Sequence, residues 1–575
     1  MDSLLAKIKK LKAWQVACIF LTIGLTTFFT GLNNPFQGDD GYQIVNNVPV
    51  HSIKNLLLLF RSSTFYNGQH LTGIYYRPMM STVFAFIYTF FGAHPLAYHL
   101  VQLLFYISSA FILFLIYKHF FRQSLALFLA LVFLVHPLNS QVVFAIPSMQ
   151  DALFFFFGIL GLWILMTYKS TRSLWAVALC LMLSLLSKET AILFIVMDLL
   201  YLFLFDRKRL NKFGGIVVVP AVLYLVLKIN AVGLNGKQNG APIDNLHLFG
   251  RLMNDPSIIL FYITKFVFPW KLATGYYWTY PTFSVSHTLI PLIIDLLVVG
   301  FFIYFGMRVR RMLTKAKYYA FLFFSVMAVI SLLPYLQIIP LDMTVCEDWF
   351  YPSIAGVLGM IGIAILTIKV RVQPHWLIIL AVILICSLGI RTAFRGTDYK
   401  SQYILAMHDL AVSKEDYSAM NNLSVGLTSQ GEFKEAVVYA QRSVTIYPAV
   451  SNYNNLGVAL QQLGNYSGAT GAYDHALKYG SLSQTYENLG QIVLAYGQPP
   501  TNFQFFQKAI NAFPKDYKLW IYIAILEGIE GNNTNAKKAI ATASKYGPVP
   551  AAIYLNIMYN QPFTLTILGK ALLVR

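Results

Sequence analysis

A few ionisable residues stand out in a chain that is otherwise strongly apolar. Two carboxyl groups are adjacent in the segment Gly38-Asp39-Asp40-Gly41. Neighbouring carboxylates cannot share one orientation, so one can face a cavity as general base for a hydroxyl while local hydrogen bonds hold the other. Asp-Asp-Gly is also good turn chemistry. The sequence leaves both interpretations open.

Two cations could receive a phosphate group. Arg77 precedes Pro78 and offers a planar fork of N–H donors, although an arginine at a membrane boundary can also be a simple anchor. Ser187-Lys188-Glu189 interrupts an apolar stretch between Leu174 and Leu204. This triplet is either a salt-bridged turn between two short helices or a lysine for a lipid-linked phosphate with a glutamate that positions it.

Three more residues complete the candidate set. Asp151 begins a Phe-rich stretch, where an ionisable side chain is costly and therefore indicates function. His136 precedes a proline at the end of an apolar run; a single histidine there is more often packing than chemistry. Glu347 lies beside Asp348 in a late polar loop.

Carboxylates beside phosphate-binding cations are what sugar transfer from a phospholipid donor requires. In that reaction Asp39 or Asp40 is the base, and Arg77 and Lys188 hold the phosphate. The supporting residues are His136 at the phosphate and Asp151, Glu189 and Glu347 at the sugar or the loops. Close carboxylates could hold a divalent metal ion, for which the candidates are Asp39, Asp40 and Asp151. No resident cofactor is implied, and the four cysteines show no paired framework.

Membrane helices must position these residues. Of the 575 residues, 57% are hydrophobic and 12% are charged, which is about half the charged fraction of a soluble domain. A membrane-spanning helix needs about 20 apolar residues. We therefore predict an all-α bundle of about eleven spans, near residues 14–32, 96–117, 124–138, 150–168, 173–187, 190–205, 214–231, 287–307, 318–338, 350–368 and 375–394.

The formal charge of +19 orients this bundle. Residues 1–397 hold 30 Lys or Arg and 13 Asp or Glu, whereas residues 398–575 hold 13 and 11. The excess cations lie in alternate connections, which stay cytoplasmic; these are residues 7–12, 118–122, 169–172, 207–212, 308–317 and 369–371. The N-terminus is then cytoplasmic, and an odd number of spans places the tail in a periplasm, an ER lumen or outside the cell. The charge is an orientation signal and does not indicate nucleic acid.

The tail, residues 398–575, contains an internal repeat. Gly431, Gly464 and Gly497 are 33 residues apart, and Gly531 follows 34 residues later. The pattern resembles the tetratricopeptide repeat, so we predict a helical solenoid of about four repeats with a capping helix at the end. Such a solenoid is either a capping superhelix without a ligand or a groove for a protein or peptide.

An ordered series of motifs also resembles a known family. The series is Gly38-Asp39-Asp40, Ile44-Val45-Asn46-Asn47, Tyr76-Arg77-Pro78, Gly92-Ala93-His94-Pro95-Leu96-Ala97-Tyr98-His99, Val135-His136-Pro137, Gln150-Asp151 and Ser187-Lys188-Glu189. With a repeat tail behind it, this order is similar to the transmembrane and tetratricopeptide repeat-containing O-mannosyltransferases and their prokaryotic relatives, in the GT-C superfamily of membrane glycosyltransferases.

The resemblance implies an inverting glycosyltransferase in residues 1–397, with a first outer loop over 33–80. The donor would be a polyprenyl- or dolichyl-phosphate sugar, usually mannose or another hexose, and the acceptor a Ser or Thr hydroxyl of a protein on the non-cytoplasmic face. The first-loop base maps to Asp39 or Asp40.

One position departs from the family pattern. Where the family commonly has Glu-Arg in the late outer loop, this chain has Glu347-Asp348. The replacement removes a cation that could face the phosphate. It favours an alternative function, a catalytically degenerate membrane scaffold whose repeats bind protein partners.

Overall fold

The computed structural model describes residues 10–66, 73–233, 240–368, 373–496 and 499–561. These residues form helices, and the one β-type pairing among them is an isolated bridge between Tyr276 and Val345. The predicted all-α class is confirmed. Several residues of the predicted basic segments and of the capping region lie outside the described residues, namely Lys7, Lys9, Lys369, Arg371 and 562–575.

The first compact unit comprises residues 1–65 and 73–414, and the second comprises 66–72 and 415–575. This division falls after α18 (Gln402–Val412), whereas the predicted domain border lies at 397/398. The difference has a physical reason, because Asp409 on α18 is bound to residues of the first unit.

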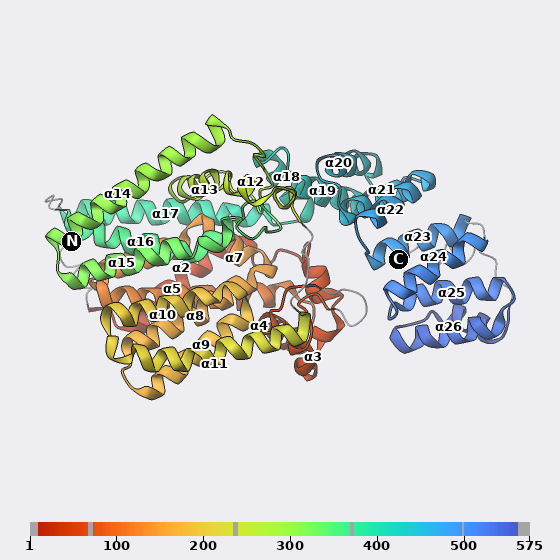
Figure 1. Cartoon of the computed structure of the whole chain (residues 1–575), viewed down its shortest axis with the longest axis horizontal. Helices are drawn as coiled ribbons and strands as arrows, with labels where there is room; N and C mark the ends of the chain where they lie inside the picture. The colour runs from red at the N-terminus through yellow and green to blue at the C-terminus, as the bar shows by residue number, and fades with distance from the viewer. Residues whose placement is uncertain (1–9, 67–72, 234–239, 369–372, 497–498, 562–575) are drawn as a thin grey trace. The chain divides into compact units, whose positions relative to one another are not determined.

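The first unit is a bundle of apolar helices (Figure 1). Within the described residues, eight helical segments are long and apolar enough to cross a membrane. They contain α2 (Ala13–Phe28), α5 (Pro95–Phe120), α8 (Met149–Thr167), α11 (Arg207–Val232), α14 (Ile290–Met312), α15 (Lys315–Ile330), α16 (Tyr351–Thr367) and α17 (Pro374–Asp398). A bent pair, α6 (Gln123–Val135) with the segment Pro137–Phe144, makes a ninth if it is one span.

All eleven predicted spans contain a helix, but two of these helices belong neither to the eight long segments nor to the bent pair. These are α9 (Thr171–Ser187) and α10 (Ile192–Phe205), of 17 and 14 residues. At about 1.5 Å per residue they fall short of a hydrocarbon core about 30 Å thick. The count of eleven spans therefore stays a prediction. The structure adds α4 (Pro78–Phe91), an apolar helix outside the eleven predicted ranges, which Pro78 starts because its fixed φ suits the first helical position.

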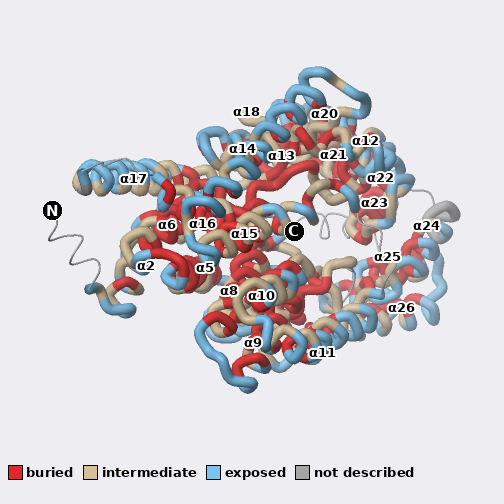
Figure 2. The backbone as a smooth tube through the Cα atoms, turned by 60° about the vertical axis from the view of Figure 1, so that its left-hand side comes forward, coloured by how far each residue is buried: buried red, intermediate tan, exposed pale blue. Residues whose placement is uncertain are grey.

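The helices of this unit differ in how far their residues are buried (Figure 2). α8 and α16 are largely buried, whereas α14 and α17 have few buried residues although their sequences are apolar. An exposed helix that is apolar on all sides is typical of a membrane span that faces lipid. The candidate polar residues lie toward the buried helices, since Asp151 is on α8 and Asp348 immediately precedes α16.

Within the described residues, the second unit contains four helix pairs followed by one more helix. The helices are α19 (Tyr417–Gln430), α20 (Phe433–Ile446), α21 (Val450–Gln462), α22 (Tyr466–Tyr479), α23 (Ser483–Tyr496), α24 (Pro499–Ala512), α25 (Tyr517–Ile529), α26 (Asn533–Tyr546) and α27 (Ala551–Met558). Gly431, Gly464 and Gly531 turn the chain inside three pairs with φ near +80°, which only glycine adopts without strain. Gly497 lies outside the described residues.

Candidate active site

The acidic pair lies in a turn between α2 and a π-helical turn, Gly41–Val45. The carbonyl of Asp39 accepts the N–H groups of Tyr42 and Gln43 at 3.0 and 2.8 Å. The Asp40 carboxylate faces inward, is 3% exposed and accepts the N–H of Gln37 at 2.8 Å. Asp39, in contrast, is open to solvent. One carboxylate is therefore held by the backbone and the other can be reached by a substrate.

The surroundings raise the pKa of both groups. Burial raises the pKa of Asp40 to about 8, against the opposing effect of the Gln37 N–H. Asp39 is accessible at the surface but has protein around it, and the partial loss of solvation raises its pKa; the nearby Asp342 raises the pKa further and Arg77 lowers it. A carboxylate with a raised pKa is a stronger base than a free aspartate.

Arg77 connects this turn to the second half of the candidate set. It precedes α4, and its Nη2 lies 3.4 Å from Glu189 Oε1. Its guanidinium also lies over the Tyr75 ring, 4.1 Å from the centroid, and the Tyr75 hydroxyl donates to Asp342 Oδ2 at 3.1 Å. Glu189 keeps 37% of its side chain exposed, and Arg77 Nε has no hydrogen-bond partner among the described residues.

Lys188 and Asp151 form the tightest pair of the site. Lys188 ends α9 and Asp151 lies in the first turn of α8, so the packing of these helices brings the two side chains together. Nζ and Oδ1 are 2.6 Å apart, and the side chains are 7% and 1% exposed. Lys188 and Glu189 therefore pair with different partners. They do not form the local salt bridge of the salt-bridged turn.

Asp348, in the late polar loop, also interacts electrostatically with the Lys188–Asp151 pair. Asp348 is 6% exposed and accepts the Ser148 hydroxyl at 3.1 Å, and its charge acts on both Asp151 and Lys188. The site thus sets two cations, Arg77 and Lys188, among five carboxyl groups, those of Asp39, Asp151, Glu189, Asp342 and Asp348. Tyr75, Ser148 and Asp342 were not among the candidate residues predicted from the sequence. Of the three, only Tyr75 had a signal there, which is its position close to Arg77.

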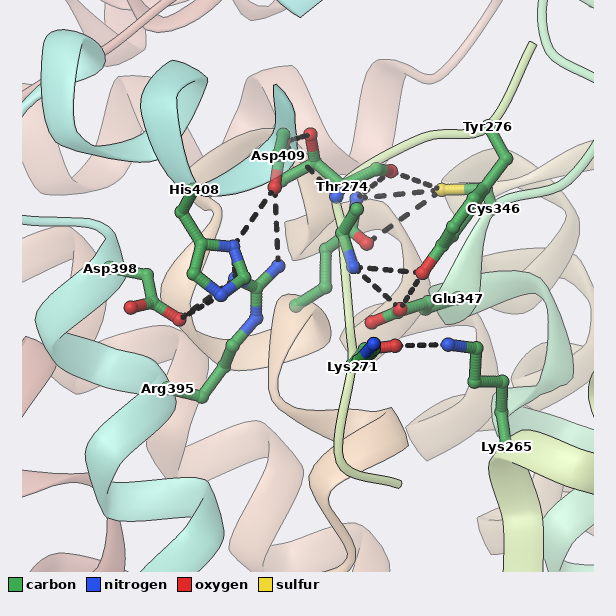
Figure 3. Close-up of polar contacts among 12 residues, drawn as sticks. Lys265, Lys271, Thr274, Tyr276, Cys346, Glu347, Arg395, Asp398, His408 and Asp409 are labelled. Carbon is green, nitrogen blue, oxygen red and sulfur yellow. Dashed lines mark hydrogen bonds and ion pairs between the residues drawn. The ribbon is translucent and has the colours of Figure 1, made fainter. Parts of the chain in front are cut away.

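Glu347 belongs to a second polar cluster, shown in Figure 3. Its Oε1 accepts the N–H of Ala273 and the hydroxyl of Tyr276, both at 2.8 Å. The fully buried Arg395 lies nearby and joins Asp398 at 2.9 Å and Asp409 at 3.8 Å. The structure therefore places Glu347 and its neighbour Asp348 in different clusters.

His136 contacts none of the other candidate residues. The Leu138 N–H donates to its Nδ1 at 3.3 Å, Nε2 lies 3.1 Å from the Phe266 carbonyl, and the ring stacks on Phe266. Both ring nitrogens are thus engaged with the backbone, which accounts for the residue structurally. Among the described residues, no three His, Cys, Asp or Glu side chains are arranged to hold a metal ion, so Asp39, Asp40 and Asp151 do not form such a group.

A bundle of apolar helices with a charged site at the helix ends, followed by helical repeats, defines the class of an all-helical integral membrane protein with a repeat unit. A family model described as dolichyl-phosphate-mannose-protein mannosyltransferase matches residues 77–230, and a tetratricopeptide-repeat model matches 418–450 and 453–480. The first match includes Arg77, Asp151 and Lys188 and begins after the acidic pair.

Three similar proteins are named protein O-mannosyl-transferases. The chain is 24% identical over 437 residues to F38B6.6 of Caenorhabditis elegans, covering 73% of this chain and 61% of that protein. It is 21% identical over 513 residues to TMTC3 of Homo sapiens, covering 79% and 54%. It is 30% identical over 95 residues to Tmtc3 of Drosophila melanogaster, covering 16% and 10%. The chain thus spans about three fifths of these relatives' length or less.

Among solved structures, YrrB, a tetratricopeptide-repeat protein with an unusual peptide-binding site, is 18% identical with a TM-score of 0.25 and covers 29% of this chain and 89% of its own. The family and relative matches confirm the resemblance drawn from the motifs. The chain thus resembles the protein O-mannosyl-transferases and carries tetratricopeptide-type repeats in its tail.

Proposed function

We propose that this protein transfers a hexose, mannose in the first instance, from a polyprenyl- or dolichyl-phosphate donor to Ser or Thr hydroxyls of a protein acceptor. The observation that carries the proposal is the solvent-accessible Asp39 within electrostatic range of Arg77, which is itself paired with the half-open Glu189. A base for a hydroxyl and a cation for a phosphate are thus in one site. The names of the relatives and of the matching family support the same chemistry.

Asp39 is the base in this proposal, and Asp40 is a positioning residue. The base must touch the acceptor hydroxyl, and Asp39 is the member of the pair that solvent reaches. Asp40 instead ties the turn together through the Gln37 N–H. A pKa near 8 also keeps Asp40 largely protonated at neutral pH.

Arg77 is the residue that contacts the donor phosphate. It retains an unpartnered Nε, and the exposed part of Glu189 allows that carboxylate to move aside when a phosphate arrives. Lys188 acts through its charge, because its Nζ is already bound to Asp151. His136, whose ring nitrogens are engaged, takes no part.

The reaction is a single displacement. The acceptor oxygen forms a bond to the anomeric carbon while its proton passes to the Asp39 carboxylate. The bond between the anomeric carbon and the phosphate oxygen breaks, polyprenyl phosphate leaves with the electron pair, and the configuration inverts. Arg77 stabilises the charge that develops on the departing phosphate. Asp151, Glu189 and Asp348 supply acceptors for sugar hydroxyls or hold the two cations.

The proposed topology rests on the charge pattern and on an odd number of spans. The N-terminus lies in the cytoplasm, the site opens on the other face, and the repeat unit lies on that same face, in a periplasm, an ER lumen or outside the cell. The acceptor protein then meets the active site and the repeats in one compartment, where the repeat groove can hold it.

A reconstituted transfer assay with a polyprenyl-phosphate hexose and a Ser/Thr-rich acceptor peptide tests the proposal. Asp39→Asn should lower the turnover by about 10²–10⁴-fold, the usual contribution of a general base. Asp40→Asn is the matched control, with the same chemical change one residue away, and should retain most of the turnover. Full turnover in Asp39→Asn would contradict the assignment.

Asp348 favours a second candidate function, the degenerate membrane scaffold. Its carboxylate lies beside Lys188 and Asp151, where it adds negative charge to a site that must accept a phosphate. On this alternative the chain is inactive, and Asp348→Arg gains transfer activity that the natural chain lacks. On the first proposal the natural chain is active, and Asp348→Arg disturbs the Lys188–Asp151 pair.

A further inference from the structure

Three cations gather at one edge of the first unit, near Glu347 and on other elements than Asp39, Arg77 and Lys188. They are Lys265 near the end of α13 (Asp255–Val267), Lys271 in the loop that follows, and Arg391 on α17. Lys265 and Arg391 are partly exposed and Lys271 is exposed. Burial lowers the pKa of Lys265, and the neighbouring charges of Lys271, Arg391 and Arg395 lower it further, whereas Glu347 opposes this change.

Backbone carbonyls hold these cations together. Lys265 Nζ donates to the carbonyl of Lys271, as Figure 3 shows. Arg391 donates through Nε and Nη2 to the carbonyl of Trp270 at 3.2 and 2.7 Å. Among the described residues, none of the three forms an ion pair with a carboxylate. Glu347 acts on Lys265, and Asp398 and Glu347 act on Arg391, through space and without a direct ion pair.

The surface around the cations is apolar. Phe268 and Trp270, on the loop that carries Lys271, are 74% and 69% exposed. Ile390 and Phe394, on either side of Arg391, are 59% and 66% exposed. The apolar run of α17 ends at Ile390, so Arg391 is the first charge beyond it. Aromatic rings and cations of this kind mark the boundary between the hydrocarbon and the headgroups of a bilayer.

We infer that Lys265, Lys271 and Arg391 form a binding site for the phosphate headgroup of an anionic membrane lipid. The three cations supply the charge complement, and the exposed Phe268, Trp270 and Phe394 lie where the lipid chains begin. A membrane lipid is the occupant, because these rings and the end of the apolar run place the cations at the bilayer surface. The site is independent of the proposed transfer reaction, which uses none of these residues.

The test follows the fluorescence of Trp270 in the full chain, reconstituted in phosphatidylcholine nanodiscs. Phosphatidylglycerol with brominated chains is added, and brominated phosphatidylcholine serves as the neutral probe; the Trp270→Phe variant identifies the signal of Trp270. We expect quenching of Trp270 at a lower mole fraction of the anionic lipid than of the neutral one. Removal of each cation should reduce the preference of the site for the anionic over the neutral lipid about fivefold. This is the usual effect of a Lys or Arg near an anionic surface.

The decisive variant is K265Q/K271Q/R391Q, and the charge-preserving variant K265R/K271R/R391K should retain the preference. The matched control R207Q/K208Q/K212Q removes the same charge at the start of α11 and should leave the Trp270 signal unchanged. If the triple variant does not fold, Lys271→Gln alone is used, because this exposed side chain makes no hydrogen bond or ion pair with another described residue. Equal quenching by both lipids, an equal effect of the control, or full competition by soluble glycerol phosphate would overturn the inference.

Discussion

The two ion pairs of the candidate site are built from the same kinds of groups but differ in their surroundings. Lys188 and Asp151 lie 2.6 Å apart with side chains 7% and 1% exposed. Arg77 and Glu189 lie 3.4 Å apart with side chains 10% and 37% exposed. The first pair joins two packed helices, α8 and α9, whereas the second joins two loop positions next to the open Asp39.

This difference indicates which cation can do chemistry. A buried pair has lost its solvation, so each charge depends on its partner and neither can be released cheaply. A half-open pair contributes little to stability because water can replace the partner. Arg77 can therefore exchange Glu189 for a phosphate, and Lys188 stays with Asp151.

The largest expected effect comes from breaking the buried pair. Asp151→Asn leaves the Lys188 charge without its closest partner in a buried position. We expect a loss of about 3–5 kcal/mol in the free energy of unfolding, measured by denaturant unfolding of the purified protein in detergent micelles. Glu189→Gln is the control and should cost about 1 kcal/mol or less. Equal losses of unfolding free energy in the two variants would show that the buried pair contributes no more to stability than the half-open pair.

The next effect concerns donor binding. Arg77→Gln should weaken the affinity for a polyprenyl-phosphate sugar roughly 10- to 100-fold, because a hydrogen bond to a charged group contributes about 1.5–3 kcal/mol. Stability should change little. Donor affinity is measured by titration in detergent, alongside Lys118→Gln, a cation at the far end of α5, as the control. An unchanged affinity would remove Arg77 from the phosphate site.

A smaller change in donor affinity, in the opposite direction, is expected for Glu189, the partner of Arg77. Glu189→Gln removes the carboxylate that competes with the phosphate, so the donor should bind severalfold more tightly. Raising the ionic strength should reduce this gain, since exposed charges are screened over about 8–10 Å. The same titration at low and high salt measures both changes. Weaker donor binding in Glu189→Gln would instead mean that Glu189 binds the sugar or holds Arg77 in place.

The apolar runs alone predicted the long helices but not α4, because a 20-residue stretch without charge has few alternatives in a bilayer. They also indicated Asp151 and Lys188, since each interrupts such a run. The pairing of these two residues could not be predicted, because it depends on how α8 packs against α9. A salt-bridged turn of Lys188 and Glu189 was one of the two interpretations that the sequence left open, and the structure pairs each residue with another partner.

Adjacent residues were hardest to assign. Glu347 and Asp348 begin a 3₁₀ turn, in which successive side chains point about 120° apart. Glu347 therefore reaches Tyr276 while Asp348 reaches Ser148. Asp342 carried no signal of its own, because a single aspartate in a loop is an ordinary residue. Its influence on Asp39 depends on the fold.

The effect of Asp342 on the pKa of Asp39 gives the last and smallest expected effect. It also tests whether Asp39 or Asp40 is the base. A base must be ionised, so the transfer rate rises with pH through the pKa of the base. Asp342 raises the pKa of Asp39 and is not among the groups that shift the pKa of Asp40. If Asp39 is the base, Asp342→Asn moves the rising limb of the pH profile of kcat/KM to lower pH. If Asp40 is the base, the limb stays near pH 8 in both proteins. The profile of Asp342→Asn, compared with the natural chain, therefore measures whether the open carboxylate or the buried one takes the proton, and only a shift to lower pH agrees with Asp39.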